Sequence, residues 1–176
     1  TVALTTNGSG NATLVNDAGL DFAASTVGGD LNATVTTGNM IDSGALTIAG
    51  TSSFTTSASD ATIALNDTSH AFTGSVTLST TGSSAYAEID GGTTALNVAA
   101  SSVGGNLYIR SGNASGITDS GTVTVGGNLT ATTDANSGVI NMGTLAVDGT
   151  VKLTTNGSGN ATVVNDAGLN FAASTV

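Results

Sequence analysis

The first 27 residues of the chain recur almost unchanged at its end. The blocks Thr1–Val27 and Thr150–Val176 lie 149 residues apart and are identical at 24 of 27 positions. The differences are Ala3/Lys152, Leu14/Val163 and Asp21/Asn170. Separate domains that diverged after duplication would not keep such identity in one short block. The sequence therefore predicts one complete tandem unit, residues 1–149, and the start of the next, residues 150–176.

A shorter period runs inside this unit. Successive segments open with a Gly-led doublet, and the intervals between doublets are 22, 24, 30, 22 and 23 residues. A further 28 residues close the unit, which indicates six segments. The doublets are Gly28-Gly29, Gly50-Thr51, Gly74-Ser75, Gly104-Gly105, Gly126-Gly127 and Gly149-Thr150.

Each segment reads as three short strands without helical periodicity. A strand of alternating apolar residues follows the doublet (Leu31, Ala33, Val35), then a polar turn, and then two further strands around sequences such as Ile41–Gly44. Three strands in each segment are typical of one coil of a parallel β-helix, whose strand edges pair when the coils stack. We predict an all-β protein with about 22–30 residues per coil and roughly seven coils, forming one continuous solenoid over residues 1–176.

Two copies of the terminal block six coils apart would lie about 29 Å apart on the same face.

The main alternative fold is a string of immunoglobulin-like sandwiches. The absence of Trp and a period near 25 residues argue against it.

Composition narrows the classes of partner. Only 8% of residues are charged, the net charge is −10, and the two cations are Arg110 and Lys152. Nucleic acid and anionic membranes are therefore poor partners. A hydrophobic content of 39% without Pro argues against a flexible linker, and no apolar run is long enough for a membrane-spanning helix. The absence of Cys excludes disulfides and thiolate metal sites.

The aspartate carboxylates are the sequence feature that most suggests a binding site. Six of them fall at comparable places in their coils, with Asn141 once in place of Asp. Stacked carboxylates could bind calcium, but the Gly-Gly-x-Gly-x-Asp repeat of calcium-binding β-rolls is absent. A ladder in which Asp and Asn accept backbone N–H bonds is the favoured interpretation. The six residues are Asp17, Asp42, Asp67, Asp90, Asp119 and Asp166.

No catalytic residues are expected. Glu88 and Asp90 flank Ile89 and point the same way, but the two cations lie in different coils and nothing completes a site. His70, the only histidine, is expected to be an exposed turn residue.

The two tyrosines and the sequons offer candidate surface sites. Tyr86 and Tyr108 are expected to face outward, where a ring can stack on a sugar. Exposed Asn-x-Ser/Thr sequons are possible glycan acceptors. They occur at Asn7, Asn11, Asn32, Asn66, Asn113, Asn128, Asn156 and Asn160.

Two segments carry a family resemblance. Val27–Ile48 and Val103–Val125 follow the pattern V-G-G-[ND]-L, a polar stretch and then a turn containing Asp-Ser-Gly. They resemble the repetitive shafts of filamentous-haemagglutinin-like exoproteins of Gram-negative bacteria. The resemblance implies a right-handed parallel β-helix, secretion by a two-partner or related route, and a role in adhesion, aggregation or biofilm.

The leading hypothesis is a non-catalytic structural or adhesive shaft segment of a giant protein, secreted or on the bacterial surface. Its partners would be neighbouring repeats, other copies joined end to end or laterally, and surface glycans. No cofactor is expected. The alternative is a carbohydrate- or calcium-binding module displayed many times for avidity.

Overall fold

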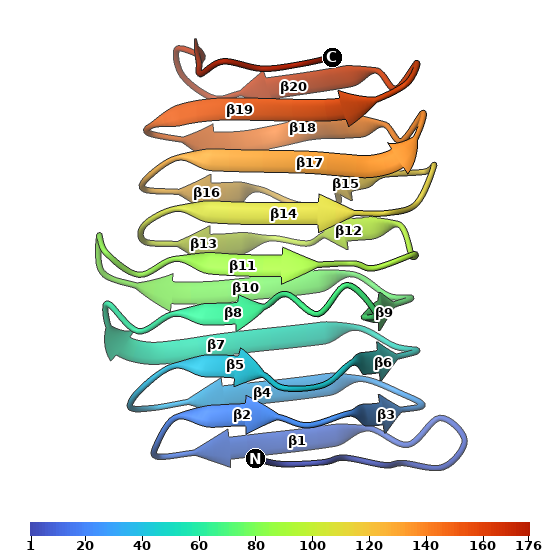
Figure 1. Cartoon of the computed structure of the whole chain (residues 1–176). Helices are drawn as coiled ribbons and strands as arrows, with labels where there is room; N and C mark the ends of the chain where they lie inside the picture. Colours follow the sequence, from blue (N-terminus) through green and yellow to red (C-terminus); the bar gives the residue numbers. More distant parts are fainter.

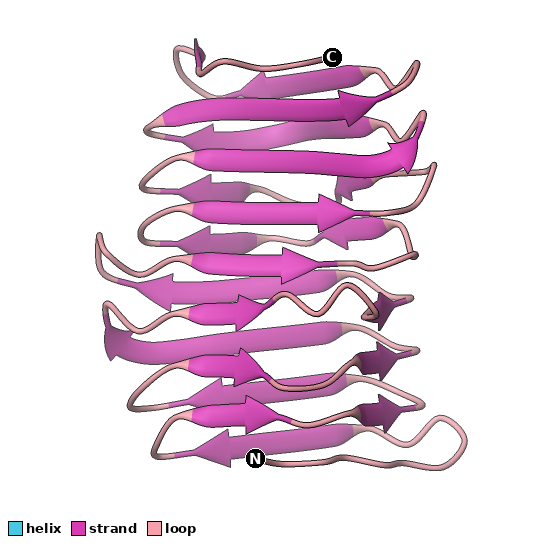
Figure 2. Ribbon diagram, viewed as in Figure 1, coloured by secondary structure: helices cyan, strands magenta, loops and turns pink.

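The computed structural model describes residues 1–176, with side chains for residues 1–135 and 137–176. The chain winds upward as a parallel β-solenoid, and every named pair of strands is parallel (Figure 1). Strands and loops make up the whole chain (Figure 2), and no helix among the described residues is long and apolar enough to cross a membrane. The expected parallel β-solenoid is confirmed; its right-handed sense stays a prediction.

The strands form three sheets. The ten-stranded sheet contains β1 (Ala12–Asn16), β4 (Leu31–Val35), β7 (Ser52–Ser59), β10 (Val76–Thr81), β12 (Leu96–Val98), β13 (Ser101–Val103), β15 (Ile117–Asp119), β16 (Val123–Val125), β18 (Ile140–Val147) and β20 (Ala161–Asn165). The eight-stranded sheet contains β2 (Leu20–Phe22), β5 (Met40–Asp42), β8 (Ile63–Leu65), β11 (Ala87–Asp90), β14 (Leu107–Ser111), β17 (Leu129–Asn136), β19 (Thr150–Asn156) and β21 (Asn170–Phe171). The three-stranded sheet contains β3 (Ser25–Val27), β6 (Leu46–Ile48) and β9 (Ala71–Phe72).

The 149-residue unit takes seven turns, not six. Val2 bridges to Phe22 in β2, and the eight-stranded sheet then leads through β5, β8, β11, β14 and β17 to β19. That strand contains Val151, the counterpart of Val2 in the next unit. The paired residues lie 19 apart at the shortest (Ala12 with Leu31) and 24 at the longest (Ile63 with Ala87), so the expected 30-residue coil is wrong. At about 4.8 Å per turn, the duplicated blocks lie about 34 Å apart.

The miscount arises because the Gly-led doublets do not mark one corner of the solenoid. Doublets at Gly28, Gly50 and Gly74 precede β4, β7 and β10 of the ten-stranded sheet. Doublets at Gly104 and Gly126 precede β14 and β17 of the eight-stranded sheet. In Figure 1 the first three strands point left and the later two point right. The 30-residue interval therefore spans about one and a half turns, and so does the closing interval of 28.

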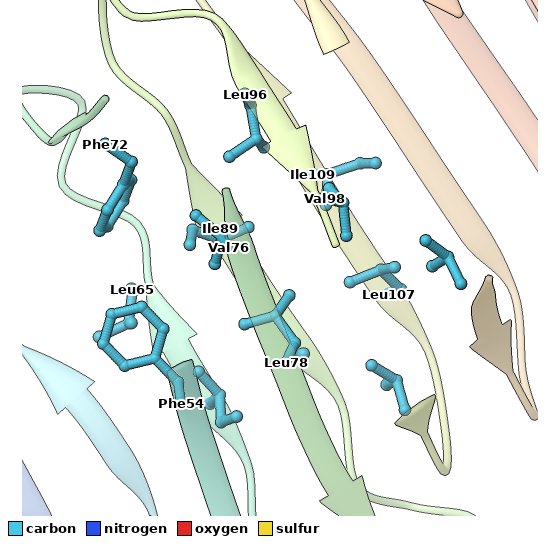
Figure 3. Close-up of a cluster of buried hydrophobic side chains, with 14 of the residues drawn as sticks. Phe54, Leu65, Phe72, Val76, Leu78, Ile89, Leu96, Val98, Leu107 and Ile109 are labelled. Carbon is cyan, nitrogen blue, oxygen red and sulfur yellow. The ribbon is translucent and has the colours of Figure 1, made fainter. Parts of the chain in front are cut away.

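The core is a narrow column of inward-facing side chains. Phe22, Phe54 and Phe72 are buried and stack edge to face, with ring centroids 6.2 and 6.0 Å apart. In Figure 3 Phe54, Leu65 and Phe72 are labelled at the left, and the labelled residues in the rest of the view are all aliphatic. Alternating apolar residues thus line the interior as the sequence predicted, and the aromatic rings gather in its lower part.

Candidate functional site

Side chains at the start of the long strands join one coil to the next. Asn11 Oδ1 accepts the Asp30 N–H at 2.8 Å, and Asp30 Oδ1 accepts the Thr51 N–H at 2.7 Å. Asn11, Asp30 and Thr51 immediately precede β1, β4 and β7, which all belong to the ten-stranded sheet. A ladder of the expected kind therefore exists, but it is built from Asn11 and Asp30 and not from the six carboxylates that were predicted to form it. The Asn or Asp that follows a Gly-led doublet was the available signal.

The same ladder recurs on the opposite side of the solenoid. Asn106 Oδ1 accepts the Asn128 N–H at 2.9 Å, and Asn128 Oδ1 accepts the Thr150 N–H at 2.8 Å. Asn106 and Asn128 immediately precede β14 and β17, and Thr150 begins β19. The ladder explains the glycines. A Cβ added at Gly127 or Gly149 would lie 2.5 Å from the Oδ1 of Asn106 or Asn128. Close approach, not a positive φ, therefore requires glycine at these two positions.

The six predicted carboxylates do not form one column, so that expectation was wrong. Asp42 and Asp90 end β5 and β11 of the eight-stranded sheet, whereas Asp119 ends β15 of the ten-stranded sheet. Asp17 and Asp166 are exposed immediately after β1 and β20. Asp67 lies in the turn after β8.

Four of these carboxylates accept backbone N–H groups. Asp67 and Asp90 each bond two residues ahead, to Ser69 and Gly92, at 2.8 and 2.7 Å. Asp42 accepts the Asn66 N–H of the following turn at 2.9 Å. Asp119 accepts two amides of the following turn, those of Gly143 (2.9 Å) and Thr144 (2.7 Å). Among the described side chains, no three His, Asp or Glu residues gather as a metal site would require.

His70 is buried, not an exposed turn residue as the sequence analysis expected. Its Nδ1 accepts the Leu46 N–H at 2.8 Å, and its Nε2 lies 3.6 Å from Asp42 Oδ2 in the turn below. The ring packs at 5.3 Å against Phe72. Burial lowers the pKa of His70, although the carboxylates of Asp42, Asp67 and Asp90 act in the opposite direction. The neutral ring is thus a packed part of the core that fixes the start of β6.

A shallow depression of about 370 Å³ lies on the outer face of the eight-stranded sheet. Parallel pairing of β11 with β14 places Glu88 beside Tyr108 and Asp90 beside Arg110. The Arg110 Nε lies 3.8 Å from Asp90 Oδ2. The lining also includes Asn66, whose Nδ2 donates to Glu88 Oε2 at 3.2 Å, and the threonines Thr130 and Thr132. The depression therefore combines carboxylates, a guanidinium group, hydroxyl groups and an aromatic ring.

Glu88 and Asp90 lie on one strand, as predicted, but the cation beside Asp90 was not predicted. A signal was present. Ala87 and Ile89 alternate inward as Leu107 and Ile109 do, and that register brings Asp90 opposite Arg110. Burial raises the pKa of the Asp90 carboxyl group, while the Gly92 N–H and Arg110 act in the opposite direction.

The two tyrosines meet on this same face. Their ring centroids are 6.2 Å apart, with an interplanar angle of 80°. Tyr108 is 39% exposed, as expected, whereas Tyr86 is half-buried. The Asn106 Nδ2 donates to the Tyr108 hydroxyl at 3.2 Å, which helps to hold the exposed ring in place.

The sequon asparagines lie mostly at the surface. Asn113 is half-buried, and its Nδ2 donates to the Thr93 carbonyl at 2.8 Å. The other seven are exposed: Asn7, Asn11, Asn32, Asn66, Asn128, Asn156 and Asn160. Whether any of them carries a glycan stays a prediction.

A family model matches most of the chain. The model of a family described as repeats of unknown function (DUF5649) matches residues 9–79 and 85–140. The chain belongs to this repeat family. The first match ends within β10, and the second begins just before β11. Strand β10 is the last strand of the ten-stranded sheet that follows a Gly-led doublet. No curated protein and no solved structure matches the chain. The family membership supports a repetitive β-solenoid but not the haemagglutinin-like relationship.

Proposed function

We propose that this DUF5649 chain is a structural shaft segment of a giant, repetitive, extracellular bacterial protein. The observation that carries the proposal is the closure of the 149-residue unit in seven turns of continuous parallel pairing. Each added unit would extend the solenoid without changing its cross-section, because every coil contacts only its neighbours. Such a segment works by its length, and its carboxylates serve to hold turns.

The shaft proposal is tested by length. Polypeptides of one, two and three units should lengthen by about 34 Å per unit, with constant cross-section in small-angle X-ray scattering and electron microscopy. Particles that grow equally in all directions would contradict it.

The surface location is tested separately. Antibody against the chain should label intact cells, and labelling only after lysis would contradict that part of the proposal.

A second candidate function is recognition of an uncharged sugar at the depression beside Tyr108. The exposed ring offers a stacking surface, while Glu88, Asp90 and Arg110 offer hydrogen-bond acceptors and donors beside it. Such a site would recur once per unit and bind multivalently. An adhesive role would follow from this property.

A neutral-oligosaccharide array followed by calorimetry tests the sugar candidate. Tyr108→Ala should abolish binding of any oligosaccharide that the unmodified chain retains. Val15→Ala, an exposed position on the opposite sheet, is the matched control and should leave binding unchanged. A Ca²⁺ titration in the same experiment addresses the calcium alternative. Heat on adding Ca²⁺ but not sugar would contradict the sugar site.

A further inference from the structure

The depression beside Tyr108 is elongated along the solenoid axis. Its lining comes from four consecutive levels of the eight-stranded sheet: Asn66 immediately follows β8, and the other residues lie on β11, β14 and β17. Figure 1 shows these four strands stacked one above another in the middle of the molecule. Three steps of about 4.8 Å give the depression a length of about 14 Å in this direction.

The depression is narrower along the strands. On β14 its outward side chains are Tyr108 and Arg110, which flank the buried Ile109. On β17 they are Thr130 and Thr132. Two residues along a strand span about 7 Å, so the depression is about twice as long as it is wide. This shape suits a ligand that lies parallel to the axis and crosses several coils.

The side chains that line the depression form two columns, because the strands pair in parallel register. One column contains Glu88, Tyr108 and Thr130, and the other contains Asp90, Arg110 and Thr132. Each coil therefore presents one pair of groups, and the pairs repeat every 4.8 Å or so. The sugar rings of an extended, β-linked glycan repeat at nearly the same spacing. Such a chain could place one ring over each coil.

The charges of the depression favour a neutral ligand. Arg110 Nε lies 3.8 Å from Asp90 Oδ2, and Asn66 Nδ2 donates to Glu88 Oε2 at 3.2 Å. A charged ligand would compete with these interactions, whereas sugar hydroxyl groups both donate and accept and can add to them.

The backbone argues against a peptide strand as the ligand. Each of β11, β14 and β17 pairs with a strand on both sides. This face therefore offers no free strand edge for the main-chain bonds by which extended peptides bind to sheets. Recognition here depends on side chains alone.

We propose that the depression binds a linear, neutral, β-linked oligosaccharide parallel to the solenoid axis, with one sugar residue over each of β11, β14 and β17. Tyr108 stacks on the middle sugar, Glu88 accepts a hydroxyl hydrogen from the first, and Thr130 bonds a hydroxyl group of the third. The inference rests on the sugar recognition proposed above and adds the shape, length and orientation of the ligand.

A length series tests the proposal by calorimetry on the unmodified chain. The probes are cello-oligosaccharides and N-acetylated chito-oligosaccharides of one to five sugar residues. In at least one series the affinity should rise with each added residue up to three and then stay constant. Malto-oligosaccharides have the glucose units of the cello series in a curved chain, and they should bind no more tightly than glucose.

The outcomes separate this inference from sugar recognition itself. Equal affinities for the monosaccharide and the trisaccharide, or for the cello and malto series, would overturn the extended, axial ligand while leaving sugar recognition intact. No binding of any neutral oligosaccharide would overturn both.

A single hydroxyl group provides a second readout. Thr130→Val keeps the branched shape but removes the donor and acceptor over the third sugar, so it should weaken trisaccharide binding about three- to tenfold and leave monosaccharide binding unchanged. Thr124→Val, on the exposed outer face of β16 in the ten-stranded sheet, is the matched control and should change neither affinity. Equal weakening of monosaccharide and trisaccharide binding by Thr130→Val would contradict the assignment of the third sugar to β17.

Discussion

The lower block (residues 28–81) and the upper block (residues 104–156) use the same strand pattern on opposite faces of one solenoid. In the lower block the long strands β4, β7 and β10 lie in the ten-stranded sheet, and the short strands opposite divide between two sheets. In the upper block the strands that follow the doublets, β14, β17 and β19, lie in the eight-stranded sheet, and the strands opposite them include the long strand β18 of the ten-stranded sheet. Only the lower block contains buried phenylalanines and the buried histidine. The shared pattern fixes strands and turns, while the interior is filled differently.

The largest expected difference between the blocks concerns the aromatic column. Phe54→Ala opens a cavity between Phe22 and Phe72 and should cost about 3–5 kcal/mol of unfolding free energy. Because coils contact mainly their neighbours, the lower block should lose hydrogen-exchange protection first. Leu129→Ala, buried in the upper block, is the matched variant and should expose β17 and its neighbours first. Equal loss of protection in both blocks would show that the solenoid unfolds as a single unit.

The ladder glycines should behave alike in the two blocks despite their opposite faces. A Cβ at Gly50 would lie 2.4 Å from Asp30 Oδ1, and one at Gly149 would lie 2.5 Å from Asn128 Oδ1. Both Gly→Ala variants should lose about 1–3 kcal/mol in urea unfolding. A Cβ added at Gly143 would meet no atom within 4 Å other than those of its chain neighbours, so Ala there should cost nothing measurable. Unequal losses of unfolding free energy for the Gly50 and Gly149 variants would show that the ladders on the two faces are not equivalent.

Acid should weaken the lower block selectively. The folded-state pKa of His70 is lowered from its ordinary value of 6.5, so the unfolded chain binds the extra proton first. The stability associated with neutral His70 is fully present above pH 6.5 and is lost as the pH falls toward the lower folded-state value. Protonation would also oppose the bond that Nδ1 accepts from the Leu46 N–H.

Exchange rates of the Leu46 amide at pH 7.5 and pH 5.5 measure this effect. The rate, corrected for the intrinsic effect of pH, should rise on acidification in the unmodified chain. His70→Gln keeps an acceptor without a titrating ring and should flatten the response. Faster exchange of both blocks to the same extent would point to the carboxylates instead of His70.

The smallest effect is expected within the ladder itself. Asp30 occupies in the lower block the place that Asn128 occupies in the upper block, and each accepts the following backbone N–H through Oδ1. Asp30→Asn should therefore change the unfolding free energy by no more than about 0.5 kcal/mol. Asp30→Ala, which removes the acceptor, should cost about 1 kcal/mol in the same denaturation series. A larger loss for Asn than for Ala would show that the charge matters more than the bond.

Strand alternation predicted the fold well, because inward and outward positions follow directly from a period of two. Leu31, Ala33 and Val35 are buried as expected. The number of turns was not predictable from the Gly-led doublets. A doublet marks the start of a long strand, and nothing within Gly74-Ser75 or Gly104-Gly105 specifies which face that strand occupies. The stacking partner decides it.

The site residues show the same limit. His70 was misplaced because its local sequence, Asp67–His70, reads as a polar turn, whereas its burial depends on Leu46 and Asp42 one coil below. The alignment of Asp67–Phe72 with Asp17–Phe22 places His70 at the position of Leu20, which is buried. Contacts between coils could be predicted from the sequence only where the strand register could be deduced, as for Asp90 and Arg110.

The seven-turn closure determines how such a gene can change in length. The unit contains two segments of about one and a half turns, and together they restore the original orientation. Gain or loss of a whole 149-residue unit leaves every face above it aligned with every face below it. Loss of one such segment alone would rotate everything beyond it by half a turn. Recombination between the nearly identical blocks therefore changes reach while preserving the direction in which each surface faces.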